Sequence, residues 1–456
     1  MHEQKLSSQA LLPNPNIAVV GSGPSGCYVS QFLAKALPGA RIAVFESLPV
    51  PYGLVRYGVA ADHQGAKAVS RQFDRLFTRG GVRFVGNVAV GRDLPFDAVA
   101  EAFDIVVLAT GLPDDRALPI PTHAGARIIG AGALLRTLNG FPESLLPVDG
   151  QGRHMSLGDE VAVIGFGNVA LDVIRLLSKN DAALHGSDVS DVALNQLRPK
   201  PPRKIHVFSR SAPDGVKCEL AMLRELLSLR TIRVSAEGID LSDATPVTNL
   251  LRQHIGVADS GMESADARTH VRLHFGRTPE SVESRGPTTT VTVSTVNGGR
   301  HSYMVDCVIT AIGFDKAAEH IPGNPTSEWA GPHVYRVGWL RRGPVGSIPE
   351  NRKDARDVAG AITRDVASGA VPVGSPGFAV VEPLIRNRMV SFADWQRIEK
   401  TENQSAEPGR CRRKLIDLEQ MLEIAASRDA TMLDQSAADD IYTTDTVGES
   451  GRRVSV

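Results

Sequence analysis

Two glycine-rich stretches, each set between an apolar run and a run with helical spacing, limit the fold of this chain more than any other feature. The first reads IAVVGSGPSGCYV at 17–29, and the second reads VAVIGFGNVALDV at 161–173. A short, continuous apolar run before such a loop is typical of a strand buried on both faces of a parallel sheet. We therefore expect an α/β protein with two Rossmann-like dinucleotide-binding domains.

The first loop carries a complete dinucleotide-binding signature, since residues 21–26 read Gly-Ser-Gly-Pro-Ser-Gly and match G-x-G-x-x-G. Gly21 permits the tight turn, Gly23 lets the backbone approach a pyrophosphate, and Gly26 lets the helix pack close to the strand. The next apolar run ends at Glu46, 20 residues after Gly26, where a carboxylate can accept hydrogen bonds from a ribose. A purely structural turn is the alternative, but strand, helix and acid in this order favour dinucleotide binding.

The second loop has alanine, Ala170, in place of the third glycine, which leaves slightly more room between helix and strand. We expect Gly165, Gly167, Asn168 and Val169 to contact a second dinucleotide. Two dinucleotides with distinct roles describe a flavoprotein that exchanges hydride with a nicotinamide cofactor. A duplicated fold with one inactive site is the alternative.

Two further apolar runs, DIVVLATG at 104–111 and CVITAIGFD at 307–315, contain a small residue followed by a glycine. Such an ending suits a backbone that crosses close to a cofactor, and the repetition fits two similar units. A strand followed by an ordinary turn is the alternative at each position.

Length and charge restrict the remaining possibilities. The chain has 456 residues, which suits two or three domains, and its formal net charge of −1 provides no overall field to attract nucleic acid or a membrane. The N-terminus has neither the apolar core of a secretory signal nor the arginines of a transit peptide, and no run reaches the ~18 apolar residues of a spanning helix. We expect a cytoplasmic protein without a membrane span.

The arrangement of the four cysteines excludes some chemistry. Cys27, Cys218, Cys307 and Cys411 lie far apart and form no C-x-x-C pair, so the sequence predicts neither a metal site nor a redox dithiol. Because disulfide reductases need paired thiols, a one-electron protein acceptor is favoured.

Three stretches identify a resemblance to a known family. ESLPVPYGLVRYGVAADHQGAK at 46–67, GFGNVALDV at 165–173 and VGWLRRGPVGSI at 337–348 resemble the adrenodoxin reductase family, which includes bacterial ferredoxin–NADP reductases of the same type. The similarity is traceable from about Ile17 to Leu422. It implies an FAD domain built from both ends of the chain, an NADP domain inserted into it, and electron delivery to a small iron–sulfur protein.

The domain boundaries follow from this resemblance and from composition. Strands KIHVFSR at 204–210, VRLHFG at 271–276 and TTVTVSTV at 289–296 are expected in the NADP domain, and the polar segment 180–203 is interpreted as a surface excursion. The predicted divisions are a flexible N-terminus at 1–16, the FAD domain at 17–110 and 332–425, the NADP domain at 111–331, and a polar, disordered tail at 426–456.

The resemblance nominates two catalytic residues, His63 and Glu225. In the family, a histidine in a P-D-H motif and the last glutamate of an E-L-R-E motif lie near the nicotinamide; here the motifs read A-D-H and M-L-R-E. Without the resemblance, a hydrogen-bonded structural histidine and a solvated helix glutamate are the alternatives.

The resemblance also implies cofactor contacts near both ends of the chain. For FAD these are Ser25, Leu54, Trp339, Gly346 and Ile348, and Gly346 is implied to approach NADP as well. Trp339 as an ordinary core residue is the alternative. This chain departs from the family pattern with valine at 345 and Pro-Glu at 349–350, so the turn chemistry there is expected to differ.

Nicotinamide preference depends on the end of KIHVFSR. An NAD site usually ends its second strand with Asp or Glu, whereas this one ends in Ser209-Arg210, which favours a 2′-phosphate. The family carries two adjacent arginines here, but this chain has Arg210 and Ser211, and Met222 replaces a family glutamate. We predict NADPH as the preferred cofactor, with measurable NADH activity.

The sequence thus predicts a ferredoxin–NADP reductase that passes hydride from NADPH to FAD and then single electrons to a ferredoxin-type iron–sulfur protein, acting as a monomer. One alternative is an NAD(P)H-dependent flavoprotein that reduces quinones or other small acceptors. Another is a non-enzymatic FAD-binding interaction subunit. An acidic ferredoxin would dock on a local basic surface, for which the sequence offers Arg56, Arg341, Arg342, Arg352 and Lys353.

Overall fold

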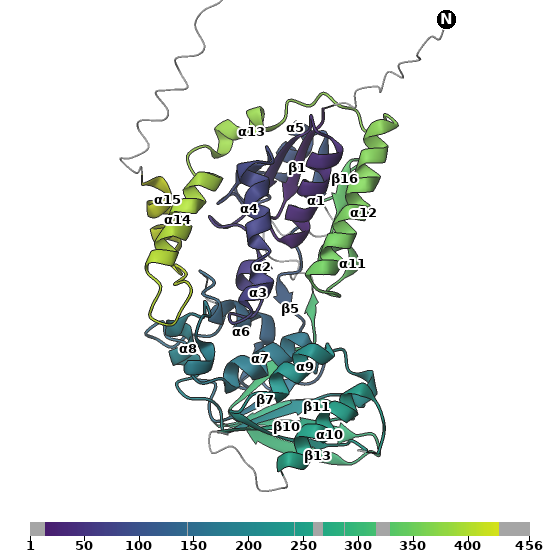
Figure 1. Cartoon of the computed structure of the whole chain (residues 1–456), viewed down its shortest axis with the longest axis vertical. Coiled ribbons are helices and arrows are strands. Elements are labelled where there is room, and N and C mark those ends of the chain that lie inside the picture. The colour runs from purple at the N-terminus through teal and green to yellow at the C-terminus, as the bar shows by residue number, and fades with distance from the viewer. Residues whose placement is uncertain are drawn as a thin grey trace, which may run out of the picture.

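The computed structural model describes residues 14–143, 145–240, 242–258, 268–286, 288–315 and 329–427. Most of the predicted N-terminal segment 1–16 and nearly all of the predicted tail 426–456 lie outside the described residues. The described chain forms two α/β units, one above the other in Figure 1. We call them the first unit and the second unit.

A parallel sheet of five strands, in the order β16-β4-β1-β2-β3, forms the centre of the first unit. Its central strand is buried on both faces, as the apolar run predicts: Ile17, Ala18 and Val19 are fully buried. Because β16 comes from the far end of the chain, the first unit is discontinuous. The strands are β1 (Asn16–Val20), β2 (Arg41–Phe45), β3 (Arg83–Val85), β4 (Ile105–Leu108) and β16 (Val334–Arg336).

Helices from both ends of the chain cover this sheet (Figure 1). The long helix α12 packs along α1, and the carboxylate of Asp104 joins the two ends of the chain by accepting from the backbone N–H of Asn16 (2.7 Å) and of Gly374 (2.9 Å). The helices are α1 (Pro24–Ala36), α2 (Leu54–Tyr57), α3 (Gln64–Lys67), α4 (Ser70–Thr78), α5 (Phe96–Ala102), α11 (Trp339–Arg342), α12 (Ile348–Ala367), α13 (Phe378–Ile385), α14 (Phe392–Gln404) and α15 (Leu418–Ala426).

The second unit repeats the plan with a parallel sheet of six strands, in the order β6-β14-β7-β8-β10-β9. The strands predicted at 204–210 and 271–276 are confirmed as β8 and β10. The strands are β6 (Ile128–Gly130), β7 (Glu160–Ile164), β8 (Lys204–Phe208), β9 (Ile232–Glu237), β10 (Thr269–His274) and β14 (Cys307–Thr310). The helices are α6 (Ala131–Leu138), α7 (Asn168–Ser178), α8 (Asp191–Leu197), α9 (Leu220–Leu227) and α10 (Pro246–Ala258), with short 3₁₀ turns at Ala182–Leu184 and Pro213–Gly215.

A separate antiparallel sheet covers one face of the second unit. It consists of β11 (Arg277–Arg285), β12 (Thr288–Thr295) and β13 (Arg300–Val305). The strand predicted at 289–296 is therefore present as β12, and its Val291 and Val293 pack in one apolar cluster with Val308 of the parallel sheet.

The chain enters and leaves the second unit along a two-stranded antiparallel ribbon, β5 (Asp114–Asp115) with β15 (Phe314–Asp315). In Figure 1 this ribbon lies between the two units. The second unit is thus inserted into the first, between β4 and β16. The residue numbers of the domain boundaries stay predictions.

The interpretation of 180–203 as a surface excursion is wrong for its centre. Leu184, Leu194 and Leu197 are buried in the core of the second unit, and Arg198 is buried as well. Helix α8 buries Leu194 and Leu197, and the preceding 3₁₀ turn buries Leu184, which the polar composition of the segment conceals. None of the described helices is both long and apolar enough to cross a membrane.

Candidate active site

The first glycine loop has the geometry that each of its glycines predicts. Gly21 has φ +107°, and a Cβ on it would lie 2.5 Å from the carbonyl oxygen of Ala109 in the DIVVLATG run. A Cβ on Gly26 would overlap the carbonyl oxygen of Gly21, so the helix packs directly on the turn. Gly23 differs, because a Cβ there would meet nothing within 4 Å. The space in front of Gly23 fits a pyrophosphate.

The second loop repeats this arrangement. Gly165 has φ +118°, and a Cβ on it would overlap the carbonyl oxygen of Ala311, in the CVITAIGFD run. A Cβ on Gly167 would again meet nothing within 4 Å, and Ala170 is fully buried against the strand. Both loops therefore keep an open cradle beside the second glycine, at the N-terminus of a helix.

Glu46 lies beside the first loop, where the spacing places it. Its Oε2 accepts from the hydroxyl of Ser22 at 2.6 Å, and its Oε1 accepts from the backbone N–H of Leu48 at 3.2 Å. The sequence reasoning missed Ser22, which also accepts a hydrogen bond from the backbone N–H of Tyr52 at 3.2 Å. Tyr52 has φ +84°, unusual for a residue with a side chain. This contact fixes the loop that precedes α2.

The predicted FAD residues from distant parts of the chain meet at the first loop. A Cβ on Gly338 would overlap the hydroxyl of Ser25, so the segment before Trp339 touches α1. Leu54 begins α2, and a Cβ on the preceding Gly53 would lie 3.1 Å from the Cα of Gly23. Among the described residues, the buried Nε1 of Trp339 has no hydrogen-bond partner. An unpaired buried donor beside an open cradle fits a bound ligand with acceptor groups, such as FAD.

Gly346 and Ile348 lie at the start of α12. Gly346 has φ +89°, which requires glycine, and Ile348 is the first residue of the helix. Glu350 forms a capping box: its carboxylate accepts from the backbone N–H of Ser347 (2.9 Å) and from its hydroxyl (2.8 Å). Among the described residues, no hydrogen bond joins Gly346 or Ile348 to either glycine loop, and their cofactor roles stay predictions.

The nicotinamide side of the second unit is polar and open. Arg210 is exposed at the end of β8 and has no hydrogen-bond or ion-pair partner among the described residues. The backbone carbonyl of the adjacent Ser211 accepts from the Ser209 hydroxyl at 3.0 Å. Asn168 pairs reciprocally with Glu219: its amide donates to the carboxylate at 2.9 Å, and its oxygen accepts from the backbone N–H at 2.8 Å. Val169 follows in the first turn of α7.

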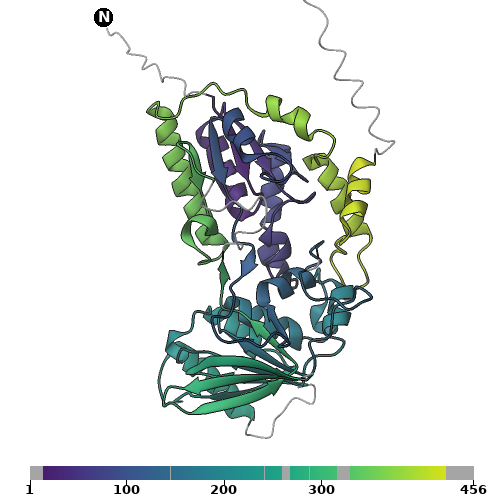
Figure 2. The same cartoon turned by 180° about the vertical axis from the view of Figure 1, so that it is seen from behind.

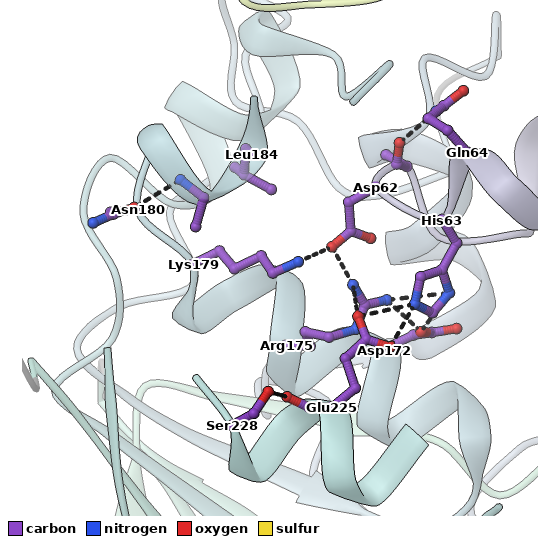
Figure 3. A network of polar contacts seen from close by, with 12 residues as sticks. Asp62, His63, Gln64, Asp172, Arg175, Lys179, Asn180, Leu184, Glu225 and Ser228 are labelled. Carbon is purple, nitrogen blue, oxygen red and sulfur yellow. Dashed lines mark hydrogen bonds and ion pairs between the residues drawn. The ribbon is translucent and has the colours of Figure 1, made fainter. Parts of the chain in front are cut away.

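The two nominated catalytic residues lie in direct contact (Figure 3). His63 precedes α3 in the first unit, Glu225 belongs to α9 in the second unit, and His63 Nε2 lies 3.0 Å from Glu225 Oε2. The other ring nitrogen, Nδ1, lies 3.5 Å from the carboxylate of Asp172 on α7. The side chains of His63 and Glu225 are 23% and 41% exposed, so a ligand can reach them.

An ion network surrounds this histidine. Arg175 binds Asp62 and also Asp172 (2.6 Å), and Lys179 binds Asp62 at 2.5 Å. Burial pushes the pKa of Asp62 upward, but Arg175 and Lys179 outweigh burial and hold this pKa below its ordinary value. For Asp172, burial prevails and raises the pKa despite Arg175.

The sequence reasoning missed the α7 members of this network, although a signal existed. Asp172 and Arg175 are three residues apart, so they share one face of an otherwise apolar helix directly after the second loop, and Lys179 follows the end of that helix. Charged residues on the buried face of such a helix need partners, and the partners come from the first unit.

With this geometry established, comparisons with known proteins identify the relatives. Residues 19–76 match the family model described as an NAD(P)-binding Rossmann-like domain. Cindoxin reductase of Citrobacter braakii is 40% identical, and the alignment covers 96% of this chain and 97% of that protein. The mitochondrial NADPH:adrenodoxin oxidoreductase of Homo sapiens is 31% identical, with coverage of 90% and 92%. The chain belongs to the adrenodoxin reductase family.

A solved structure of an adrenodoxin reductase relative supports the fold. FprA from Mycobacterium tuberculosis in complex with NADPH superimposes with a TM-score of 0.78 at 28% identity, covering 91% of this chain and 100% of that one. The predicted family and the predicted fold class, two Rossmann-like domains of which one is inserted into the other, are confirmed.

The basic residues proposed for docking are less available than the sequence suggests. Arg56 is buried, so its assignment to a docking surface is wrong. Arg341 and Arg342 both pair with the buried carboxylate of Asp354, which neutralises part of their charge. The guanidinium of Arg352 lies over the Tyr28 ring, 5.9 Å from its centre. Arg352 and Lys353 are nevertheless exposed on α12, so a basic docking surface there stays a prediction.

Proposed function

We propose that this protein is an FAD-dependent ferredoxin–NADP reductase, which transfers electrons from NADPH to a ferredoxin-type iron–sulfur protein. The observation that carries the proposal is that one chain has two open glycine cradles, one in each unit. His63 of the first unit contacts Glu225 of the second unit. The reductase names of the two full-length relatives agree with the proposal. We propose further that the protein acts as a cytoplasmic monomer.

The first loop would hold the FAD pyrophosphate, with Glu46 beside the ribose and the Gly338–Trp339 segment against the same cradle. The second loop would hold the NADPH pyrophosphate, with Arg210 near the 2′-phosphate. Bound FAD would supply a ring that accepts hydride and returns electrons singly. The chain itself mainly positions the two ligands, since correct placement provides much of the rate in such transfers.

His63 and Glu225 are proposed to organise the nicotinamide end. His63 can share a proton from Nε2 with the Glu225 carboxylate, while Asp172 and Arg175 hold the ring from the other side. Because the histidine comes from the first unit and its carboxylate partners from the second, the pair also fixes the approach of the two units.

An anaerobic titration tests the function. Purified protein should contain FAD, and stoichiometric NADPH should bleach the visible absorption band of oxidised flavin. Turnover with a purified ferredoxin should then exceed turnover with a quinone at equal concentration. Faster quinone turnover would favour a small-molecule reductase instead, and flavin that does not bleach with NADPH or NADH would identify a non-enzymatic FAD-binding subunit.

Arg210 should set the preference for NADPH. Its guanidinium is exposed and unpaired among the described residues, so it can bind a phosphate without breaking another contact. A charge-assisted hydrogen bond contributes about 1.5–3 kcal/mol, so Arg210→Ala should lower the NADPH/NADH ratio of kcat/KM roughly ten- to a hundredfold. The wild-type ratio should be modest, since Ser211 replaces a second arginine.

Arg203→Ala is the matched control, because Arg203 lies just before the other end of β8 and pairs with Asp159 at 3.3 Å. Its selectivity should stay at the wild-type value. An NADPH/NADH ratio of kcat/KM that is unchanged in Arg210→Ala would show that Arg210 does not bind the 2′-phosphate. A wild type that prefers NADH would show the same.

A further inference from the structure

Residues 405–417, between α14 and α15, form a loop that we call the C-terminal strap. It starts from helices that flank the first unit, reaches α8 in the second unit and returns (Figures 1 and 2). At its far end the strap pairs with the backbone of the second unit: Gly186 donates to the Gly409 carbonyl at 2.7 Å, and Cys411 donates to the Ser187 carbonyl at 3.0 Å. The strap therefore connects the two units at a further place, apart from the β5–β15 ribbon and the contacts of Asp62 and His63 with the second unit.

Charged side chains reinforce this connection. Arg410 on the strap binds the Asp191 carboxylate at the start of α8 (2.8 Å) and donates to the Leu184 carbonyl (3.1 Å). Lys414, also on the strap, lies 2.8 Å from Asp188 of the second unit, and Lys67 of the first unit lies 2.7 Å from the same carboxylate. One carboxylate thus binds two lysines, one from α3 and one from the strap.

The cluster around Asp188 is buried, with side chains only 3–8% exposed. Burial alone would raise the pKa of Asp188, but the two lysines overcome it and lower the pKa to about 2. Burial lowers the pKa of both lysines. The free energy needed to remove charges from water is often as large as the free energy gained when they pair, so such a cluster need not stabilise the fold. Its placement across the boundary of the two units suggests a positional role instead.

Asp188 also contacts the segment that contains the candidate catalytic histidine, His63. The backbone N–H of Asp188 donates to the Ala61 carbonyl at 3.1 Å. The next residue, Asp62, binds Arg175 of α7 and Lys179 directly after α7, and His63 follows. The 61–67 segment of the first unit is therefore held to the second unit at both of its ends.

We propose that the C-terminal strap is an interdomain clasp that sets the position of the nicotinamide-binding unit relative to the flavin-binding unit, with Arg410, Lys414 and Asp188 as positioning residues. The inference rests on the proposed function for its catalytic consequence. Among the described residues, no hydrogen bond or ion pair joins the strap to either glycine loop, so opening the strap should leave FAD and nucleotide binding intact and lower only the rate of the transfer between them.

Arg410→Ala is the test, and Arg412→Ala is its matched control on the same strap. Arg412 pairs with Glu399 at 2.6 Å and with Glu402 at 3.5 Å, but both partners lie on α14, so neither pair reaches the second unit. In Arg410→Ala the limiting rate of flavin reduction at saturating NADPH should fall at least about fivefold, since a 1 Å misplacement can cost ~100-fold. FAD content and the Kd of NADP⁺ should stay within about twofold, and Arg410→Lys should restore much of the rate.

Hydrogen exchange provides a readout that needs no activity. The amides of Gly186 and Cys411 should exchange faster in Arg410→Ala and keep wild-type rates in Arg412→Ala. If these amides stay protected in Arg410→Ala, the next variant is Lys414→Met. It removes the contact between Lys414 and Asp188 and leaves the Lys67–Asp188 pair intact.

Faster exchange at these amides without a slower flavin reduction would overturn the proposal, and so would an equal loss of rate in Arg412→Ala. Protected amides together with a wild-type rate in both Arg410→Ala and Lys414→Met would overturn it as well. A wild type whose flavin NADPH does not reduce would refute the proposed function instead. The exchange experiment would still decide whether the strap joins the units.

Discussion

Gly23→Val is expected to give a folded protein that purifies almost without flavin, whereas Gly167→Val should keep its flavin and lose its response to NADPH. Both glycines precede a helix, and a Cβ on either would meet no protein atom within 4 Å. The Cβ of valine therefore meets no protein atom, and the side chain is expected to occupy the space proposed for the pyrophosphate. Flavin absorbance per protein and anaerobic reduction by NADPH measure the two outcomes separately.

Gly26→Val provides the contrast within the same loop. A Cβ at Gly26 would overlap the carbonyl oxygen of Gly21, so this variant should fail to fold rather than lose a ligand. Circular dichroism should separate it from Gly23→Val, which should keep a wild-type spectrum. Full flavin content in Gly23→Val would show that the first loop does not hold the pyrophosphate, and normal NADPH reduction in Gly167→Val would remove the second loop from the proposed site.

Local sequence patterns predict the parts of this molecule that depend on local chemistry. Each glycine in the loops has its own steric reason, visible in the chain itself, and Gly21 and Gly26 have the geometry that this reason requires. The apolar runs before the loops become buried strands because a parallel sheet covered on both faces needs them. The contact between His63 and Glu225 agrees with the positions that the family resemblance nominated.

Long-range partners of charged residues could not be predicted in the same way. The sequence predicts Arg56 on a docking surface, yet it is buried and pairs with Glu402, which lies 346 residues later. Lys67 and Lys414 meet on Asp188 only because the strap folds back across both units. Hydrophobic periodicity carries no information on which carboxylate pairs with which cation, so these clusters appear only in three dimensions.

Glu402→Gln should destabilise the protein by about 3–5 kcal/mol, because it leaves the Arg56 guanidinium buried without a charged partner. Both side chains are at most 3% exposed, and Glu402 Oε1 accepts from Arg56 at 2.5 Å and from the backbone N–H of Leu415 at 3.0 Å. Glutamine keeps the volume and an acceptor for Leu415, so the variant removes little besides the charge. The apparent free energy of unfolding in urea measures the loss.

Glu407→Gln is the control for this prediction, since Glu407 pairs with Arg413 at 3.2 Å while both side chains are more than half exposed. A surface pair of this kind should contribute less than about 1 kcal/mol. If the large effect of Glu402→Gln comes from the unpaired charge, the double variant Arg56→Met/Glu402→Leu should recover most of the lost stability, because an apolar pair of similar volume needs no charge partner. A double variant as unstable as Glu402→Gln would instead assign the loss to the Leu415 N–H, which loses its Glu402 acceptor, or to packing against Trp395, over whose ring the Arg56 guanidinium lies at 4.9 Å.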